Sequence, residues 1–388
     1  MARANSKNNS KKRGLFIGGR FDYTLIVITF LLLCIGLIIL LSASSPTSIK
    51  ENGNGYSYAL KQGVIALVGL GFMMAFSIFD YRNFKALKWP IYIVCITLLV
   101  IVGLFGVGEN GARRWFNIPG LGTLQPSEFV KVGLVLFYAA FLTDIKESNR
   151  IKKCVPGFLA PIVLFLPIAF VLYKMQNHLS ATLIMGMVMI IQLFVVGASL
   201  KYFFLSAGIG GVLVGLYLLS SAMNPEDGGF RTGRIQTWLN IDQDVTGAAW
   251  QINQSLYAIG SGGLFGLGLG ASRQKYLYLP EPQNDFIFAI LAEELGFVGG
   301  VVVILLFILF VWRGVVIAMK AQDTFGSLIA IGITSIIGLQ ALINIAVVTN
   351  TIPVTGMPLP FFSYGGSALL ANLIGVGILL SVARNSKK

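Results

Sequence analysis

Asp285 is the residue best placed to do chemistry, because its carboxylate lies where a polar, glycine-rich stretch (residues 250–296) runs into an apolar helix. Glu293 and Glu294 follow it, roughly 12 Å further along that helix at about 1.5 Å per residue. Ionisable side chains at membrane depth are costly, which makes function the default hypothesis for them. A structural role for Asp285 is the alternative, because Asp is also a preferred residue for capping a helix N-terminus. Side-chain chemistry alone leaves both interpretations open.

Glu128 and Lys131 form a second charged group, in the sequence QPSEFVK at residues 125–131. Residues three apart share one face of a helix, so these two side chains can form an ion pair. A purely structural pair and a role in lining a binding site are both open. Glu293 and Glu294 are adjacent and therefore point about 100° apart on a helix. We expect a structural role for these two, with at least one of them facing a polar interior.

Arg113 and Arg114, beside Trp115, are the cations best suited to bind a phosphate group. The planar fork of a guanidinium matches the oxygens of a phosphate. An anchor at the membrane interface is the alternative for this pair. Weaker candidates for phosphate binding lie in a later polar stretch: Arg231, Arg234, Arg273 and Lys275.

The composition excludes several classes of protein. With 55% hydrophobic residues, 12% charged residues and a mean hydropathy of +0.78, the chain is predicted to be an integral membrane protein and not a soluble domain. The net charge of +13 does not predict nucleic-acid binding, because the cations gather in the tails and in alternate loops. The three cysteines have no metal-binding spacing, so we predict neither a disulfide framework nor a metal site. The single histidine, His178, excludes an HExxH site, and we interpret it as a loop or cap residue.

Ten apolar runs predict an all-α bundle of about ten transmembrane helices, each with the length that crosses the hydrocarbon. They are residues 23–41, 62–79, 89–106, 127–143, 155–173, 179–198, 201–221, 286–312, 325–349 and 366–383. The tails and the loops on their side of the membrane hold 19 of the 29 Lys and Arg residues. By the positive-inside rule we expect both termini in the cytoplasm, with a basic tail at 1–21 and one membrane domain at 22–388.

Two irregular stretches are predicted to shape the outer face. The loop at 222–285, between the seventh and eighth spans, is far longer than an ordinary connection, and such loops are usually functional or disordered. Its aromatic residues argue against disorder, and 230–239 fits a short amphipathic helix at the membrane surface. Residues 353–367 contain three prolines and no charge. Irregular backbone near membrane depth must be buried in protein or line a cavity, and we expect the latter here.

Six ordered segments resemble the SEDS family (shape, elongation, division and sporulation proteins), which are bacterial cell-wall polymerases. The segments are GARRW at 111–115, QPSEFVK at 125–131, QSLYAIGSGGLFGLGLG at 254–270, YLPE at 278–281, DFIFAILAEELG at 285–296 and PVTGMPLPFFSYGGSALL at 353–370. The resemblance covers nearly the whole chain after residue 20. Residues 266–281 and 292–296 are more similar to the FtsW and SpoVE branches than to RodA. One local departure is Gln283-Asn284, where many relatives carry a His-Thr pair.

The resemblance implies a peptidoglycan glycosyltransferase that polymerises lipid II at the outer face of the bacterial cytoplasmic membrane, for cell division or sporulation. It implies Asp285 as the catalytic residue. We expect substrate binding by Arg113, Arg114, Glu128, Lys131, Arg231, Arg234, Lys275, Gln254 and Ser255. We expect the cavity to be shaped by Pro353, Gly356, Pro358, Pro360, Ser363, Gly365 and Gly366.

The implied partners are lipid II and the lipid-linked glycan, a class B penicillin-binding protein as transpeptidase, and membrane proteins of division or sporulation. No nucleic acid is among them. The sequence reveals no cofactor with certainty, although Mg²⁺ or Mn²⁺ would suit a departing diphosphate. The alternative function is a flippase that carries lipid II across the membrane, for which a site nearer the midplane is expected. A scaffold that only holds a partner synthase is a third alternative, and it leaves Asp285 without a role.

Overall fold

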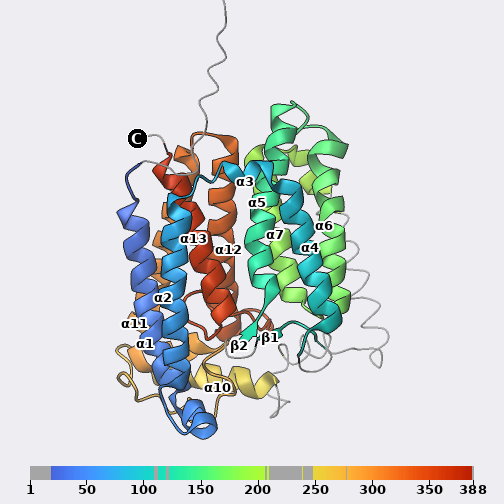
Figure 1. Cartoon of the computed structure of the whole chain (residues 1–388). Helices are drawn as coiled ribbons and strands as arrows, with labels where there is room; N and C mark the ends of the chain where they lie inside the picture. The colour runs from blue at the N-terminus through green and yellow to red at the C-terminus, as the bar shows by residue number, and fades with distance from the viewer. Residues whose placement is uncertain are drawn as a thin grey trace, which may run out of the picture.

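The computed structural model describes residues 19–108, 112–118, 122–205, 208, 238, 248–276 and 278–386, which form a bundle of long helices running side by side (Figure 1). In chain order the elements are α1 (Tyr23–Asn52), α2 (Ser57–Ile78), α3 (Asn83–Ala86), α4 (Lys88–Phe105), β1 (Phe116–Ile118), β2 (Gly122–Leu124), α5 (Pro126–Glu147), η1 (Val155–Leu159), α6 (Ala160–Phe170), η2 (Val171–Met175), α7 (Leu179–Val196), α10 (Ala248–Ser261), α11 (Ile287–Lys320), α12 (Thr324–Val348) and α13 (Gly366–Arg384). The predicted all-α membrane bundle is confirmed.

Among the described residues, 8 helical segments are long and apolar enough to cross a membrane, so the chain is a multi-pass membrane protein. They coincide with eight of the ten predicted runs. α5 corresponds to a ninth run and lies alongside the other helices (Figure 1), although it carries the charged residues Glu128 and Lys131. The tenth run, 201–221, lies mostly outside the described residues. The predicted surface helix at 230–239 does too, apart from Trp238.

α11 departs from the prediction, because it is broken at Gly296. The backbone there has φ 69° and ψ −169°, which is not helical. A Cβ on Gly296 would lie 2.3 Å from the Gly266 nitrogen, so only glycine permits this close approach. The predicted eighth span, 286–312, is thus wrong in two respects: α11 extends to Lys320, and it consists of two helical pieces. The apolar pattern runs through the break unchanged, so the pattern does not reveal it.

The two described ends of the chain meet at one end of the bundle. Asp22 caps α1 by accepting a hydrogen bond from the Leu25 nitrogen (3.1 Å), and it forms an ion pair with Arg313 (2.6 Å). Arg384, the last residue of α13, donates to the carbonyl of Gly19 (3.3 Å). α10 and the β1–β2 hairpin lie at the opposite end (Figure 1).

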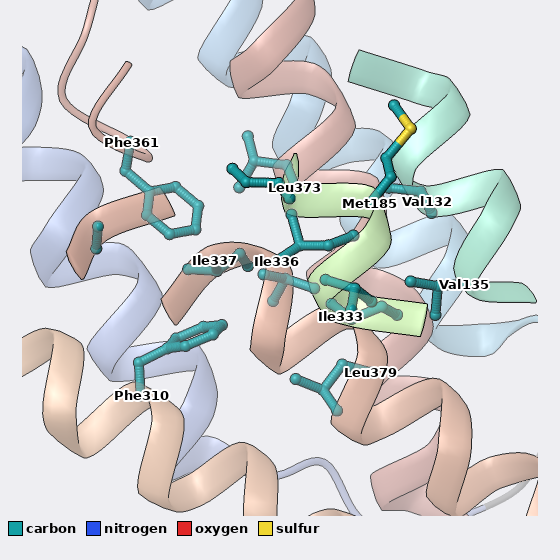
Figure 2. Close-up of a cluster of buried hydrophobic side chains, with 14 of the residues drawn as sticks. Val132, Val135, Met185, Phe310, Ile333, Ile336, Ile337, Phe361, Leu373 and Leu379 are labelled. Carbon is teal, nitrogen blue, oxygen red and sulfur yellow. The ribbon is translucent and has the colours of Figure 1, made fainter. Parts of the chain in front are cut away.

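The core lies where α5, α7, α11, α12 and α13 meet. α12 packs against α5, α7 and α11, while α13 packs most extensively against α2. Figure 2 shows buried side chains of this core: Val132, Val135, Met185, Phe310, Ile333, Ile336, Ile337, Phe361, Leu373 and Leu379.

Candidate active site

Asp285 lies immediately before α11, whose first helical residue is Ile287 and whose capping residue is Phe286. Asp285 therefore lies one residue before the capping position. The Asp285 carbonyl accepts a hydrogen bond from the side-chain amide of Asn344 (2.7 Å). Its carboxylate oxygen Oδ2 lies 3.4 Å from the position that a Cβ on Gly356 would occupy. The carboxylate thus faces the segment 353–365.

The segment 353–365 is irregular, as predicted, and polar contacts hold it in place. Ser180, in the first turn of α7, donates its hydroxyl to the Thr355 carbonyl (2.6 Å). The Tyr364 nitrogen donates to the Gln283 carbonyl (2.8 Å), two residues before Asp285. The segment therefore connects the Asp285 loop with the start of α7.

A second set of contacts holds the far end of this segment. Gln62 of α2, which is 1% exposed, donates to the Ser363 carbonyl (3.3 Å) and accepts from the Gly365 nitrogen (3.3 Å). The Ser363 hydroxyl accepts from the Leu359 nitrogen (2.8 Å). The predicted cavity-shaping residues, Pro353, Gly356, Pro358, Pro360, Ser363, Gly365 and Gly366, all lie in this segment or at the start of α13. Gly356 faces Asp285, and a cavity-shaping role for the other six stays a prediction.

Glu128 and Lys131 form the predicted ion pair at the start of α5. Lys131 Nζ lies 2.7 Å from Glu128 Oε2, and the two side chains are only 4% and 5% exposed. The i,i+3 spacing brings them together on one helix face. Lys131 also lines a small cavity between α5, α7 and α12, together with Tyr138 and Gln192.

His178, at the N-terminal cap of α7, lies within the electrostatic reach of two predicted site cations. Its ring is half-buried, and in the described part of the chain its buried Nδ1 has no hydrogen-bond partner. Burial, together with the positive charges of Arg114 and Lys131, lowers the pKa of His178 to about 3, so the ring is neutral near neutral pH. Arg114 donates to the carbonyls of Gln176 (3.0 Å) and Asn177. Arg114, Lys131 and His178 therefore belong to one electrostatic group.

No functional role was expected for His178, Ser180 or Asn344 from the sequence. Each of these residues is a polar side chain within or beside an apolar span. In a membrane protein such a residue indicates either helix association or function. That signal does not reveal which distant segment each residue contacts. The contacts of Ser180 and Asn344 with segment 353–365 depend on the fold.

The remaining predicted cations are placed differently. Arg113 is exposed and donates to the Leu104 carbonyl (2.8 Å), at the end of α4. Arg231 and Arg234 lie outside the described residues. Lys275 is 3% exposed, and its ammonium lies 3.0 Å from Glu294 Oε1. The Lys275 ammonium is therefore paired with a carboxylate of the protein itself, and we exclude Lys275 from the site.

Glu293 and Glu294 fit the structural role that we expected. They are 1% and 0% exposed and lie in the half of α11 before the break. Glu293 accepts hydrogen bonds from the Ser272 hydroxyl (2.5 Å) and the Arg273 nitrogen (2.9 Å). These contacts attach the glycine-rich stretch to α11.

Gln254 and Ser255 of α10 are buried at 6% and 0% exposure. The Ser255 hydroxyl donates to the Val348 carbonyl (2.8 Å), at the end of α12. Ser255 therefore attaches α10 to the bundle, and the substrate contact that we expected of it stays a prediction. Substrate binding by Gln254 stays a prediction.

The fold and the site together define a polytopic membrane protein with a carboxylate and cations gathered at one end of its helices. The family model for FtsW, RodA and SpoVE, described as cell cycle proteins, matches residues 23–388. The chain belongs to this family.

Named relatives support this assignment over nearly full length. Stage V sporulation protein E of Bacillus subtilis is 43% identical over 369 residues, covering 94% of this chain and 98% of the relative. The probable peptidoglycan glycosyltransferase FtsW of Geobacter sulfurreducens is 39% identical over 370 residues, covering 95% and 96%.

Solved structures show the same fold. One, described as structural coordination of polymerization and crosslinking by a peptidoglycan synthase complex, matches with a TM-score of 0.77 at 27% identity, covering 94% of this chain and 98% of the other. The rod shape determining protein RodA of Thermus thermophilus matches with a TM-score of 0.66 at 27% identity, covering 95% and 98%.

Proposed function

We propose that this protein is a peptidoglycan glycosyltransferase that polymerises lipid II at the outer face of the cytoplasmic membrane, with Asp285 as its catalytic base. The observation that carries the proposal is that the Asp285 carboxylate faces Gly356. Gly356 lies in the segment 353–365, which Ser180 holds through a hydrogen bond to the Thr355 carbonyl. Ser180 is two residues after His178 in the sequence. Burial, followed by the positive charges of Arg114 and Lys131, lowers the pKa of His178. The names of the relatives and the described synthase complex support this activity.

The chemistry assigns a task to each group. Joining an α-linked lipid diphosphate to a sugar hydroxyl in a β-linkage is an inverting displacement. Asp285 removes the proton from the attacking hydroxyl, and such general-base help is typically worth about 10²–10⁴ in rate. Arg114 and Lys131 offset the negative charge that gathers on the departing diphosphate.

A divalent ion is compatible with this site. Mg²⁺ is usually held by one or two carboxylates together with substrate phosphates, and not by a cage of protein ligands alone. Among the described residues no group of three or more His, Cys, Asp or Glu side chains is close enough to hold a metal. Asp285 is the carboxylate that would contribute a ligand, and the ion would supply positive charge to the diphosphate. A requirement for Mg²⁺ or Mn²⁺ stays a prediction.

The position of the site supports the polymerase over the flippase. Asp285, Ser180 and Lys131 lie at or near the ends of their helices, whereas a transporter site is expected near the midplane. The opposite end of the bundle carries Arg82 and Lys85, in line with the positive-inside rule. We therefore propose that the Asp285 end faces outward and that both termini are cytoplasmic.

The proposed partner is a class B penicillin-binding protein, which would cross-link the strands. The description of the similar synthase complex pairs polymerization with crosslinking. Similarity to both a sporulation protein and FtsW proteins supports a role in sporulation or division. Adding the cognate transpeptidase to the purified protein should raise the rate of glycan formation.

Asp285→Asn tests the proposed function most directly. The variant keeps the side-chain volume and removes the base. We expect normal membrane insertion and lipid II binding, with no glycan formed from purified lipid II in proteoliposomes. Product near the wild-type level would contradict the proposal. A wild-type protein that flips lipid II without polymerising it, and a variant that loses this flipping, would support the flippase.

A further inference from the structure

Asn344 is a buried polar residue near the end of α12, in a stretch that is otherwise apolar. It is 1% exposed. A buried amide is costly unless its polar groups are hydrogen-bonded, so its partners indicate why it is tolerated. Asn344 contacts the Asp285 region and segment 353–365 at the same time.

The amide nitrogen of Asn344 donates to the carbonyl of Asp285 and to the carbonyl of Met357, each at 2.7 Å. Because both acceptors are carbonyl oxygens, only the nitrogen of the amide fits this position, which determines how the amide is oriented. In the described part of the chain its buried oxygen, Oδ1, has no hydrogen-bond donor. The two protons of one NH₂ group thus join two segments that lie far apart in the sequence.

These two hydrogen bonds attach the backbone of Asp285 to the backbone next to Gly356. Met357 directly follows Gly356, which has φ 68° and lies against Asp285 Oδ2. Holding the Met357 carbonyl therefore holds the Gly356 wall, and holding the Asp285 carbonyl holds the residue that bears the carboxylate. Among the described residues, no other side chain donates a hydrogen bond to both the Asp285 carbonyl and the Met357 carbonyl.

We propose that Asn344 is a positioning residue, whose amide sets the distance and direction between the Asp285 carboxylate and the wall at Gly356. This inference rests on the proposed function, in which Asp285 is the base. A misplacement of about 1 Å at a reacting group can cost about 10²-fold in rate. Loss of the amide should therefore affect turnover more than binding.

The test uses full-length protein in nanodiscs and measures initial rates of glycan formation across a range of lipid II concentrations. Asn344→Leu removes both donors and keeps a side chain that branches at Cγ. Asn344→Asp keeps the shape but turns carboxylate oxygens toward two carbonyls. The matched control is Gln340→Leu, one turn earlier on α12, where the side chain is 2% exposed and its buried Oε1 has no partner among the described residues.

We expect kcat to fall about 10- to 100-fold in both Asn344 variants, with KM within about twofold of wild type. The Gln340→Leu control should change both constants by less than about twofold. A kcat within twofold of wild type in Asn344→Leu would overturn the proposal. An equal loss of kcat in the control would do so too, since it would show a general packing effect.

Hydrogen exchange provides a readout that does not depend on activity. Amides in 283–287 and 355–358 should exchange about tenfold faster in Asn344→Leu than in wild type, while those of α10 stay unchanged. Unchanged exchange in both segments would overturn the proposal. If the wild-type protein makes no glycan, the proposed function fails, and this exchange result still decides whether Asn344 holds the two segments together.

Discussion

Two buried ion pairs of similar geometry occupy this protein, and they differ in what surrounds them. Lys131 lies 2.7 Å from Glu128, and Lys275 lies 3.0 Å from Glu294. All four side chains are at most 5% exposed. Distance and burial alone would therefore assign both pairs the same role.

The hydrogen bonds around the two lysines separate them. The Lys275 ammonium also donates to the Ser42 hydroxyl (2.8 Å) and the Gly270 carbonyl (2.6 Å), so all three of its protons have acceptors. In the described part of the chain, the Lys131 ammonium is paired with the Glu128 carboxylate alone. The Lys275 ammonium therefore has an acceptor for each of its protons, whereas the Lys131 ammonium has one paired carboxylate, in line with its proposed role in the site. We therefore use the hydrogen bonds of each lysine, and not its burial, to predict different roles for the two pairs.

Lys131→Met should give the largest effect. Removing one preorganised cation from a charge-stabilising site typically costs about 10²–10³ in rate. We expect glycan synthesis from lipid II to fall by that factor in folded protein. The double variant Lys131→Met/Glu128→Gln should remain as inactive, because neutralising the partner does not replace the cation. Wild-type rates in either variant would remove Lys131 from the site.

Lys275→Met should instead lower stability. Breaking a buried pair leaves Glu294 uncompensated, at a typical cost of about 3–5 kcal/mol in the free energy of unfolding. The molecules that remain folded should polymerise lipid II at close to the wild-type rate. Steric trapping in bicelles measures the first quantity, and rates normalised to folded protein measure the second. A stable but inactive variant would place Lys275 in the active site.

Lys275→Met combined with Glu294→Leu should recover part of this stability. Replacing both members of a buried pair by apolar residues is often neutral or stabilising. Here we expect a gain of about 2 kcal/mol over Lys275→Met alone. Recovery stays incomplete, since the Ser42 hydroxyl and the Ser272 nitrogen lose Glu294 as an acceptor. Further destabilisation in the double variant would contradict the assignment of this pair as structural.

Replacing His178 should give the smallest effect, which is a change in how the stability of the protein depends on pH. Its folded-state pKa of about 3 lies below the ordinary value of 6.5, so the native protein binds fewer protons than the unfolded chain between these values. Stability should therefore decline as pH falls below about 6.5, with no contribution from His178 above that pH. His178→Asn should flatten this part of the stability profile. An unchanged profile would show that burial and the charges of Arg114 and Lys131 do not hold the ring neutral.

The sequence predicted those features that arise from near neighbours. The spacing of Glu128 and Lys131 indicated their ion pair, and proline content indicated the irregular segment at 353–367. The pairing of Lys275 with Glu294 was missed, since it depends on the glycine-rich stretch folding back on α11. We therefore expected Lys275 to bind substrate, although its ammonium is paired with Glu294 inside the protein. The break at Gly296 was also missed, because apolar residues continue on both sides of it.

The packing of α13 against α2 has a consequence for how the protein is made. Gln62 of α2 reaches its partners Ser363 and Gly365 across 301 and 303 residues. The Tyr81 nitrogen likewise donates a hydrogen bond to the Ser381 hydroxyl, 300 residues away in the sequence. During synthesis α2 therefore enters the bilayer long before these groups are translated. Gln62 acquires both contacts only when α13 is inserted. The segment 353–365, which faces Asp285, is therefore attached to α2 only late in biogenesis.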